Sequence, residues 1–274
     1  MRGIDSIRIA LPIELSSGTT TRWLLSDRCW AAAASAVDAH LEGAAGDFTI
    51  EQPKTATNRD IFRCSVIDPA VRVIAKTFPM RSLKQQLYRY RRYGPTEARN
   101  LIAARARGLP VPEFYGFGWQ QRGLLVKRTM VLIEDLQGFS LLSTIENISS
   151  EDAKLTMLRP VAETLLSLYA AGCNHIDLGA ENICVSDSEP MDVRLIDFMY
   201  AAFLPAPSTT VLAFQAAYVC DSLRDWGVEE STCRQWAIEL FSRNEVVAEI
   251  EGLVEQYDDF RGSRLSRKER LALR

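Results

Sequence analysis

The sequence predicts a two-lobed α+β fold, in which a β-rich first lobe with one inserted helical region precedes a mainly helical second lobe. Segments rich in β-branched and aromatic residues gather between residues 48 and 136, and helical patterns interrupt them once. Amphipathic helical patterns prevail after residue 138. At 274 residues the chain is long enough for two lobes with real cores. We therefore expect a cleft between the lobes.

The first lobe begins with an antiparallel meander. Three strand-like segments, DFTIEQP (47–53), DIFRCSVI (60–67) and VRVIAKTF (71–78), are separated only by KTATN and DPA. Two further strands are expected at EFYGFGW (113–119) and RTMVLIEDL (128–136).

Two helices are expected between the third and fourth strands. In SLKQQLYRYRR the residues Leu83, Leu87 and Tyr90 have helical spacing, and in TEARNLIAARARG residues Glu97 and Leu101 share one apolar stripe. Gly108 is expected to end the second helix.

The second lobe is expected to start with a long helix at SEDAKLTMLRPVAETLLSLYAAG, capped by Ser150 and kinked at Pro160. A polar stretch and two short strands, NICVS and VRLIDF, follow it. Three more helical patterns fill residues 208–260, and the chain is thus divided into an N-terminal extension packed on the first lobe (1–47), a first lobe (48–137) and a second lobe (138–274).

Composition restricts the classes of function. The net charge of −3 gives no general attraction to nucleic acid, although KQQLYRYRRY (84–93) and the C-terminal RGSRLSRKERLALR are strongly basic. These runs predict either solvated surfaces or contacts with an anionic acceptor or membrane. The six cysteines form no C-x-x-C pair, which predicts reduced, buried thiols. Because no apolar run resembles a signal peptide or membrane span, a cytoplasmic protein is expected.

Five polar residues occur in an order that suggests shared chemistry. Lys76 lies within a strand, and Glu97 lies on the apolar stripe of a following helix, where an unpaired carboxylate would be costly. The stretch HIDLGAENICV places Asp177 and Asn182 just before a strand, and Asp197 follows the next strand in LIDF. Each alone has an ordinary structural explanation, but their conjunction predicts a functional site.

This order, spacing and context resemble the protein-kinase-like fold. Within it, HIDLGAENICV, LIDFMYA and EARNLIAARARGLPVPEFYGFG are similar to the lipopolysaccharide-core kinases of Gram-negative bacteria, which phosphorylate Kdo or heptose. The resemblance covers residues 48–200 well. It implies a kinase that uses ATP and Mg²⁺, has lipopolysaccharide core as its acceptor, and makes peripheral contact with the cytoplasmic face of the inner membrane.

The resemblance also implies individual roles. Lys76 would hold the ATP phosphates and Glu97 would fix its ammonium, while Asp177 would orient the acceptor hydroxyl. Asn182 and Asp197 would offer oxygen ligands to Mg²⁺. The backbone of Glu134 to Leu136 would bind adenine, and His175 would brace the loop rather than transfer protons.

Some positions depart from this pattern. The loop KTATNRD (54–60) has no glycine where kinases have a glycine-rich loop, so Lys54, Thr55, Thr57 or Arg59 would have to assist the backbone amides. Ile176 replaces the usual catalytic-loop arginine, and no long activation segment follows Asp197. A small-molecule kinase of the aminoglycoside or choline type and a catalytically silent pseudokinase are therefore the alternatives.

Overall fold

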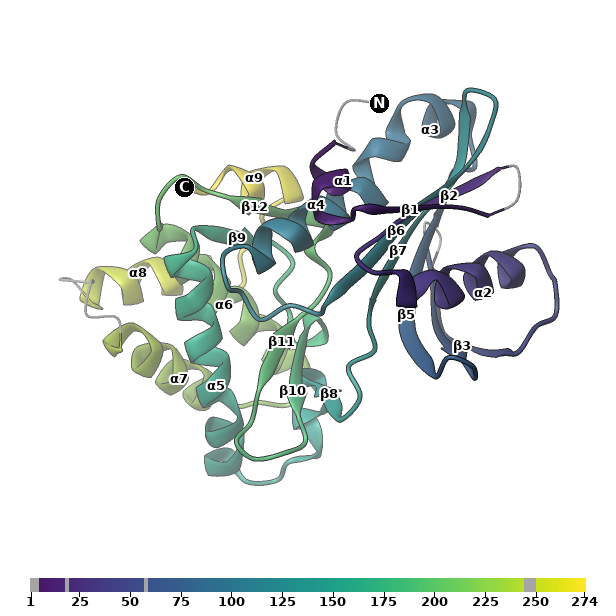
Figure 1. Ribbon diagram of the computed structural model, residues 1–274. Helices are drawn as coiled ribbons and strands as arrows, with labels where there is room; N and C mark the ends of the chain where they lie inside the picture. Colours follow the sequence, from purple (N-terminus) through teal and green to yellow (C-terminus); the bar gives the residue numbers. More distant parts are fainter. Residues whose placement is uncertain (1–4, 18–19, 57–58, 244–249) are drawn as a thin grey trace. The chain divides into compact units, whose positions relative to one another are not determined.

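A computed structural model describes residues 5–17, 20–56, 59–243 and 250–274. The chain divides into two compact units, of which the first comprises Met1–Ala103 and Pro112–Leu136 and the second Ala104–Val111 and Gln137–Arg274. The predicted mixed architecture, with its β-rich first part and mainly helical second part, is confirmed (Figure 1). The three-part division predicted at residues 47 and 137 stays a prediction.

Unit 1 is built on a seven-stranded antiparallel sheet with the order β1-β2-β6-β7-β5-β4-β3. Its strands are β1 (Ile13–Ser17), β2 (Thr21–Leu25), β3 (Phe48–Ala56), β4 (Arg59–Val66), β5 (Val71–Pro79), β6 (Phe114–Arg122) and β7 (Leu125–Glu134). Its helices are α1 (Asp5–Ala10), η1 (Arg28–Trp30), α2 (Ala31–Leu41), α3 (Leu83–Leu87), η2 (Arg89–Arg92) and α4 (Gly94–Arg105), the last of which continues into unit 2. The meander β3-β4-β5 was correctly predicted.

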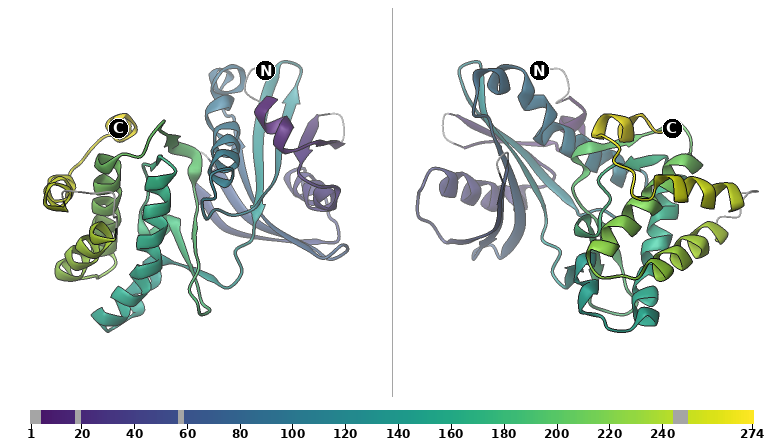
Figure 2. Two further views of the ribbon diagram at one scale, coloured as in Figure 1. Left: turned by 60° about the vertical axis from the view of Figure 1, so that its left-hand side comes forward. Right: turned by 180° about the vertical axis from the view of Figure 1, so that it is seen from behind.

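The sheet of unit 1 lies between helices on its two faces (Figure 2). Helix α2 packs through small residues onto a core that includes Phe62, Val73 and Ala75. Because side chains alternate along a strand, Lys76 points from β5 to the opposite face, where α4 lies. The sheet thus separates this hydrophobic cluster from the charged pair.

Two features of unit 1 differ from the sequence prediction. The residues KTA belong to β3, because β3 pairs with β4 as far as Ala56 and Arg59. The helix expected over 82–92 is a short α-helix followed by the 3₁₀ helix η2, and Leu83 and Leu87 are exposed while Tyr90 is buried. A 3₁₀ turn has three residues per turn, so it rotates the apolar stripe away from its α-helical direction.

Unit 2 has a helical body with two small sheets, β11-β10-β8 and β12-β9. Its elements are β8 (Phe139–Leu141), η3 (Leu142–Asn147), α5 (Glu151–Ala170), β9 (Cys173–His175), η4 (Ala180–Asn182), β10 (Ile183–Ser186), β11 (Val193–Leu195), η5 (Phe198–Tyr200), β12 (Ala201–Phe203), α6 (Thr209–Asp225), α7 (Glu230–Ser242), α8 (Ile250–Phe260) and α9 (Arg267–Ala272). Helix α6 is buried along most of its length and forms the centre of the body.

Several predicted features of unit 2 are confirmed. The Ser150 side chain accepts a hydrogen bond from the Ala153 amide and caps α5. The helix continues through Pro160, and the kink expected there stays a prediction. Gly108 has a positive φ of 71° just beyond α4.

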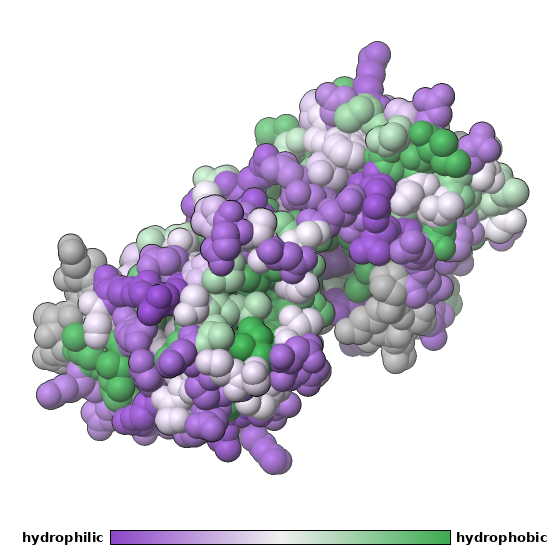
Figure 3. Space-filling view, turned by 90° about the horizontal axis from the view of Figure 1, so that it is seen from below, coloured by the Kyte–Doolittle hydropathy of each residue, from purple (hydrophilic) through white to green (hydrophobic). Residues whose placement is uncertain are grey.

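No described helix is long and apolar enough to cross a membrane. On the face drawn in Figure 3 the surface is mainly hydrophilic, with apolar colour in separate patches.

Candidate active site

Lys76 and Glu97 form a buried ion pair in unit 1. Their Nζ and Oε1 atoms are 2.5 Å apart, and the two residues are only 5% and 0% exposed. Lys76 lies in the interior of the sheet, because β5 is paired with β4 on one side and β7 on the other. A buried pair of opposite charges avoids the large cost of either charge alone. The structure therefore joins the two residues that the sequence placed on a strand and a helix.

Gly94 allows α4 to begin close against the sheet. A Cβ atom at this position would lie 2.7 Å from Oγ1 and 3.1 Å from Cβ of Thr129 in β7. Glu97 follows in the first helical turn, where the positive end of the helix dipole also favours a carboxylate. The close approach of α4 at Gly94 thus sets the position from which Glu97 reaches Lys76.

The segment from Glu134 to Leu136 ends unit 1 and precedes the first long stretch of unit 2. The Glu134 amide donates to the Glu113 carbonyl, and the Glu134 carboxylate accepts from the Glu113 amide at 3.0 Å. Between the two predicted adenine contacts, the buried Asp135 carboxylate pairs with Arg63 at 2.9 Å and Arg72 at 3.1 Å. Sequence reasoning missed this anchor, because its partners lie far away in β4 and β5.

Asp177, Asn182 and Asp197 belong to unit 2. The Asn182 Nδ2 donates to the Asp177 carbonyl at 2.7 Å, which closes the loop between β9 and β10. The Ile196 amide donates to the Asn182 carbonyl, so the residue before Asp197 is tied to the same loop. The structure brings these three predicted residues to one set of hydrogen-bonded loops.

Asp197 has a left-handed backbone, with φ of 63° and ψ of 54°. Among the described residues it is the only non-glycine residue with a positive φ. Such conformations cost free energy and cluster at functional sites, where surrounding contacts hold them. The backbone here sets the direction of the Asp197 carboxylate at the start of η5.

His175 braces this loop, as the sequence predicted. Its ring is 1% exposed, its Nε2 donates to the Ile196 carbonyl at 3.0 Å, and it meets the Phe198 ring edge-on at 4.7 Å. Burial lowers the pKa of His175 below its usual value, although Asp197 and Asp177 oppose the shift. The imidazole is therefore held neutral and serves as a structural hydrogen-bond donor.

The donor set of unit 2 fits a magnesium ion. Mg²⁺ takes hard oxygen ligands, commonly one or two from the protein with the rest from phosphate and water. Because the Asn182 amide nitrogen is directed to the Asp177 carbonyl, its Oδ1 is the atom left to act as a ligand. Asn182 and Asp197 would hold the ion through this amide oxygen and a carboxylate.

The C-terminal helix α9 contributes two arginines to Asp177. Arg270 donates to Asp177 Oδ1 at 2.9 Å and to the Ile176 carbonyl at 2.8 Å, and Arg267 donates to Asp177 Oδ2 at 3.3 Å. The Asn174 side chain donates to the Arg270 carbonyl at 2.9 Å. Both oxygens of the predicted catalytic carboxylate are thus bound by one helix. The only sequence feature that pointed to this arrangement was the basic run at 261–274.

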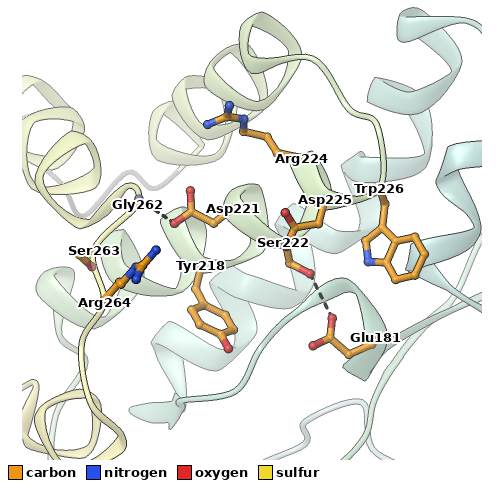
Figure 4. Close-up of a pocket in the computed structure, with 10 residues that line it drawn as sticks. All are labelled: Glu181, Tyr218, Asp221, Ser222, Arg224, Asp225, Trp226, Gly262, Ser263 and Arg264. Atoms are coloured by element: carbon orange, nitrogen blue, oxygen red, sulfur yellow. Dashed lines mark hydrogen bonds between the residues drawn. The ribbon is translucent and has the colours of Figure 1, made fainter.

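A pocket of about 820 Å³ adjoins the same loop in unit 2 (Figure 4). Glu181, from the stretch between Asp177 and Asn182, lines it together with Tyr218, Ser222, Asp225 and Trp226 of α6 and its C-terminal end. The Ser222 hydroxyl accepts from the Ala180 amide at 2.9 Å and donates to the Glu181 carboxylate at 3.0 Å. The wall of the pocket is therefore hydrogen-bonded directly to the predicted catalytic loop.

Comparison with known proteins identifies the type of enzyme. Residues 75–202 match the model of the lipopolysaccharide kinase (Kdo/WaaP) family. Over this segment the chain is similar to the lipopolysaccharide kinases of that family. The matched segment contains every predicted site residue from Lys76 to Asp197. The predicted family resemblance and the prediction of an enzyme are confirmed, and a kinase of this type implies use of ATP.

The fold of the chain is shared with many solved structures. One of them is described as WaaP in complex with acyl carrier protein, with 15% sequence identity and a TM-score of 0.59 over 87% of this chain and 97% of that chain. At this identity the likeness shows the fold alone. A search of curated proteins finds no match to the chain.

The glycine-free loop is described only in part. Residues 57–58, and with them Thr57, lie outside the described residues. The backbone of Lys54 and Thr55 belongs to β3, and Arg59 begins β4. The roles suggested for these side chains stay predictions.

Proposed function

We propose that this kinase transfers the γ-phosphate of ATP to a hydroxyl of Kdo or heptose in the lipopolysaccharide inner core. The observation that carries the proposal is Asp177, whose carboxylate is fixed by Arg270 on a loop that also contributes Glu181 to the wall of a pocket. Phosphoryl transfer depends mainly on positioning and charge stabilisation, so a rigid carboxylate at the acceptor hydroxyl suits the reaction.

The other site residues have separate roles in this proposal. Lys76, held by Glu97, binds the phosphates of ATP, and the backbone from Glu134 to Leu136 binds adenine. Asn182 and Asp197 hold Mg²⁺, which neutralises charge on the phosphates when bound. The oxygen of the acceptor hydroxyl attacks the γ-phosphorus, and Asp177 accepts the proton of that hydroxyl. The bond between the γ-phosphorus and the oxygen that bridges it to the β-phosphate breaks, and ADP leaves.

The pocket supports a saccharide acceptor. Tyr218 and Trp226 are half-buried residues of the lining, and aromatic rings can pack against the C–H surfaces of a sugar. Glu181 and Asp225 are exposed carboxylates that can accept hydrogen bonds from sugar hydroxyls. Arg264, also in the lining, forms no ion pair with any residue that the structure describes and could meet an anionic substituent of the core.

The test is transfer of labelled γ-phosphate from Mg-ATP to lipopolysaccharide core that lacks inner-core phosphate. We expect label in the sugar, a loss of about 10²- to 10⁴-fold in Asp177→Asn, and nucleotide binding that is nearly intact in that variant. Asp225→Asn should raise the KM for the core, whereas Asp259→Asn, an exposed carboxylate of α8 outside the pocket, should not. Loss of ATP binding in Asp177→Asn would contradict the role of Asp177.

An aminoglycoside added as a second acceptor distinguishes the alternative small-molecule kinase. Glu181 and Asp225 would also suit a cationic acceptor, since both are carboxylates in the pocket wall. Transfer to the aminoglycoside but not to the core would reject the proposed acceptor while keeping the kinase. A protein partner, such as the acyl carrier protein bound in the similar WaaP structure, is a further proposal that pull-down with that protein would test.

A further inference from the structure

The segment from Arg81 to Arg92 in unit 1 exposes apolar side chains among cations. Leu83, Leu87 and Tyr88 are 65%, 39% and 72% exposed. The surrounding Arg81, Lys84, Arg89, Arg91 and Arg92 are also exposed. These eight side chains, on α3, η2 and their flanks, are called the basic–apolar patch below; α3 is labelled in Figure 1.

Hydrogen bonds of the buried side of α3 anchor the basic–apolar patch to the rest of unit 1. Ser82 and Gln85 form a capping box at the start of α3, in which the Gln85 amide donates to Ser82 Oγ at 3.3 Å and Gln85 Oε1 accepts from the Ser82 amide at 3.0 Å. The buried Gln86 side chain donates to the Met80 carbonyl at 2.9 Å and accepts from Lys127 of β7 at 3.0 Å. The exposed leucines are therefore presented by an anchored turn of helix.

The cations of the patch are not neutralised by the described protein. None of the five forms an ion pair with a described residue, and Arg91 donates instead to the hydroxyl of the neighbouring Tyr90. Five like charges on so short a segment repel one another and attract an anionic surface. The sequence left open whether this basic run is a solvated helix face or contacts an anionic surface, and its helical spacing did not indicate that Leu83 and Leu87 are exposed beside the cations.

We infer that the basic–apolar patch docks the kinase on an anionic phospholipid surface. Basic residues next to a membrane are attracted by anionic headgroups, while leucine and tyrosine side chains enter the boundary between headgroups and acyl chains. Protruding side chains on a few helical turns suit a lipid interface better than a protein partner, which needs about 800 Å² of matched surface on each side. The inference deepens the proposed function, because lipopolysaccharide core is attached to a lipid.

Vesicle co-sedimentation of the full chain tests the inference. We expect binding to phosphatidylglycerol-containing vesicles, none to pure phosphatidylcholine vesicles, and release when NaCl rises from about 0.1 M to about 0.5 M. Leu83→Ser with Leu87→Ser, and separately Arg89→Gln with Arg92→Gln, should each weaken partitioning by about tenfold or more. Leu124→Ser is the matched control, because Leu124 is 91% exposed in the turn between β6 and β7, outside the patch.

The outcomes separate this inference from the proposed function. Equal vesicle binding by the patch variants and the wild type, or no binding to anionic vesicles, would overturn the inference. Binding of an acidic protein such as acyl carrier protein through the same residues, without vesicle binding, would replace it. Phosphate transfer by the wild type to deacylated, water-soluble core tests the proposed function without any membrane, so its failure leaves the docking result intact.

Discussion

At the scale of single residues, the Lys76–Glu97 pair combines a structural role with its proposed chemical role. Both charges are removed from water, and among the described residues Glu97 Oε2 has no hydrogen-bond partner. The pair therefore depends on its one short contact between Nζ and Oε1. Removing either partner leaves a buried charge without compensation, whereas removing both does not.

We expect Lys76→Met to lower the free energy of unfolding by about 3–5 kcal/mol, because Glu97 then remains buried and unpaired. The double variant Lys76→Met/Glu97→Leu should recover most of this loss, since no buried charge remains. Urea unfolding of both variants measures the difference. Phosphate transfer should be lost in both, which separates stability from chemistry. A double variant as unstable as the single one would show that the pair is not the cause.

At the scale of elements, helix α9 holds the predicted catalytic carboxylate in place. Its Arg270 guanidinium joins the Asp177 carboxylate to the Ile176 carbonyl, and the same guanidinium lies 5.2 Å from the centre of the Tyr218 ring in the pocket wall. Arg267 lies 3.8 Å from the centre of the Tyr200 ring. A helix close to the C-terminus thus positions a carboxylate some ninety residues earlier in the chain.

Arg270→Gln should lower kcat by about 10²-fold, because a carboxylate that loses its anchor is displaced from the attacking hydroxyl. The KM for ATP should change little, since Arg270 has no place in the proposed nucleotide contacts. Arg270→Lys should restore part of the loss, and Lys268→Gln, an exposed residue of the same helix, should have no effect. Steady-state kinetics with both substrates varied checks this. A rise in KM for ATP without a fall in kcat would contradict the positioning role.

At the scale of the whole molecule, patterns local in sequence were predictable and contacts between distant segments were not. The meander, the α4 stripe with Glu97 and the loop with Asp177 each carry a local signal of spacing or alternation. Strands β1 and β2 fill one edge of the sheet, but they are short and lie in a segment with weak periodicity. The contact of Arg270 with Asp177 depends on how unit 2 folds, so no spacing in the sequence indicates it.

The six cysteines are distributed over both units, so the reactivity of their thiols reports how well each unit is buried. All are free; Cys29 alone is exposed, with its amide donating to Asp27 at 2.8 Å. Burial raises the pKa of Cys64 to about 11 and of Cys173 to about 12. The thiols of Cys220 and Cys233 each donate to the other residue's carbonyl.

Treatment of the native protein with a thiol reagent at a pH of about 8 should therefore modify Cys29 rapidly, because a thiolate reacts only where the reagent can reach it. The others should react only when the protein unfolds, and urea should expose them. Cys29→Ser should remove the rapid phase and leave the slow phase unchanged, while Cys64→Ala should leave the rapid phase intact. Mass spectrometry of the modified protein counts the groups. Rapid modification of two or more thiols would mean that a unit opens more readily than its buried cysteines indicate.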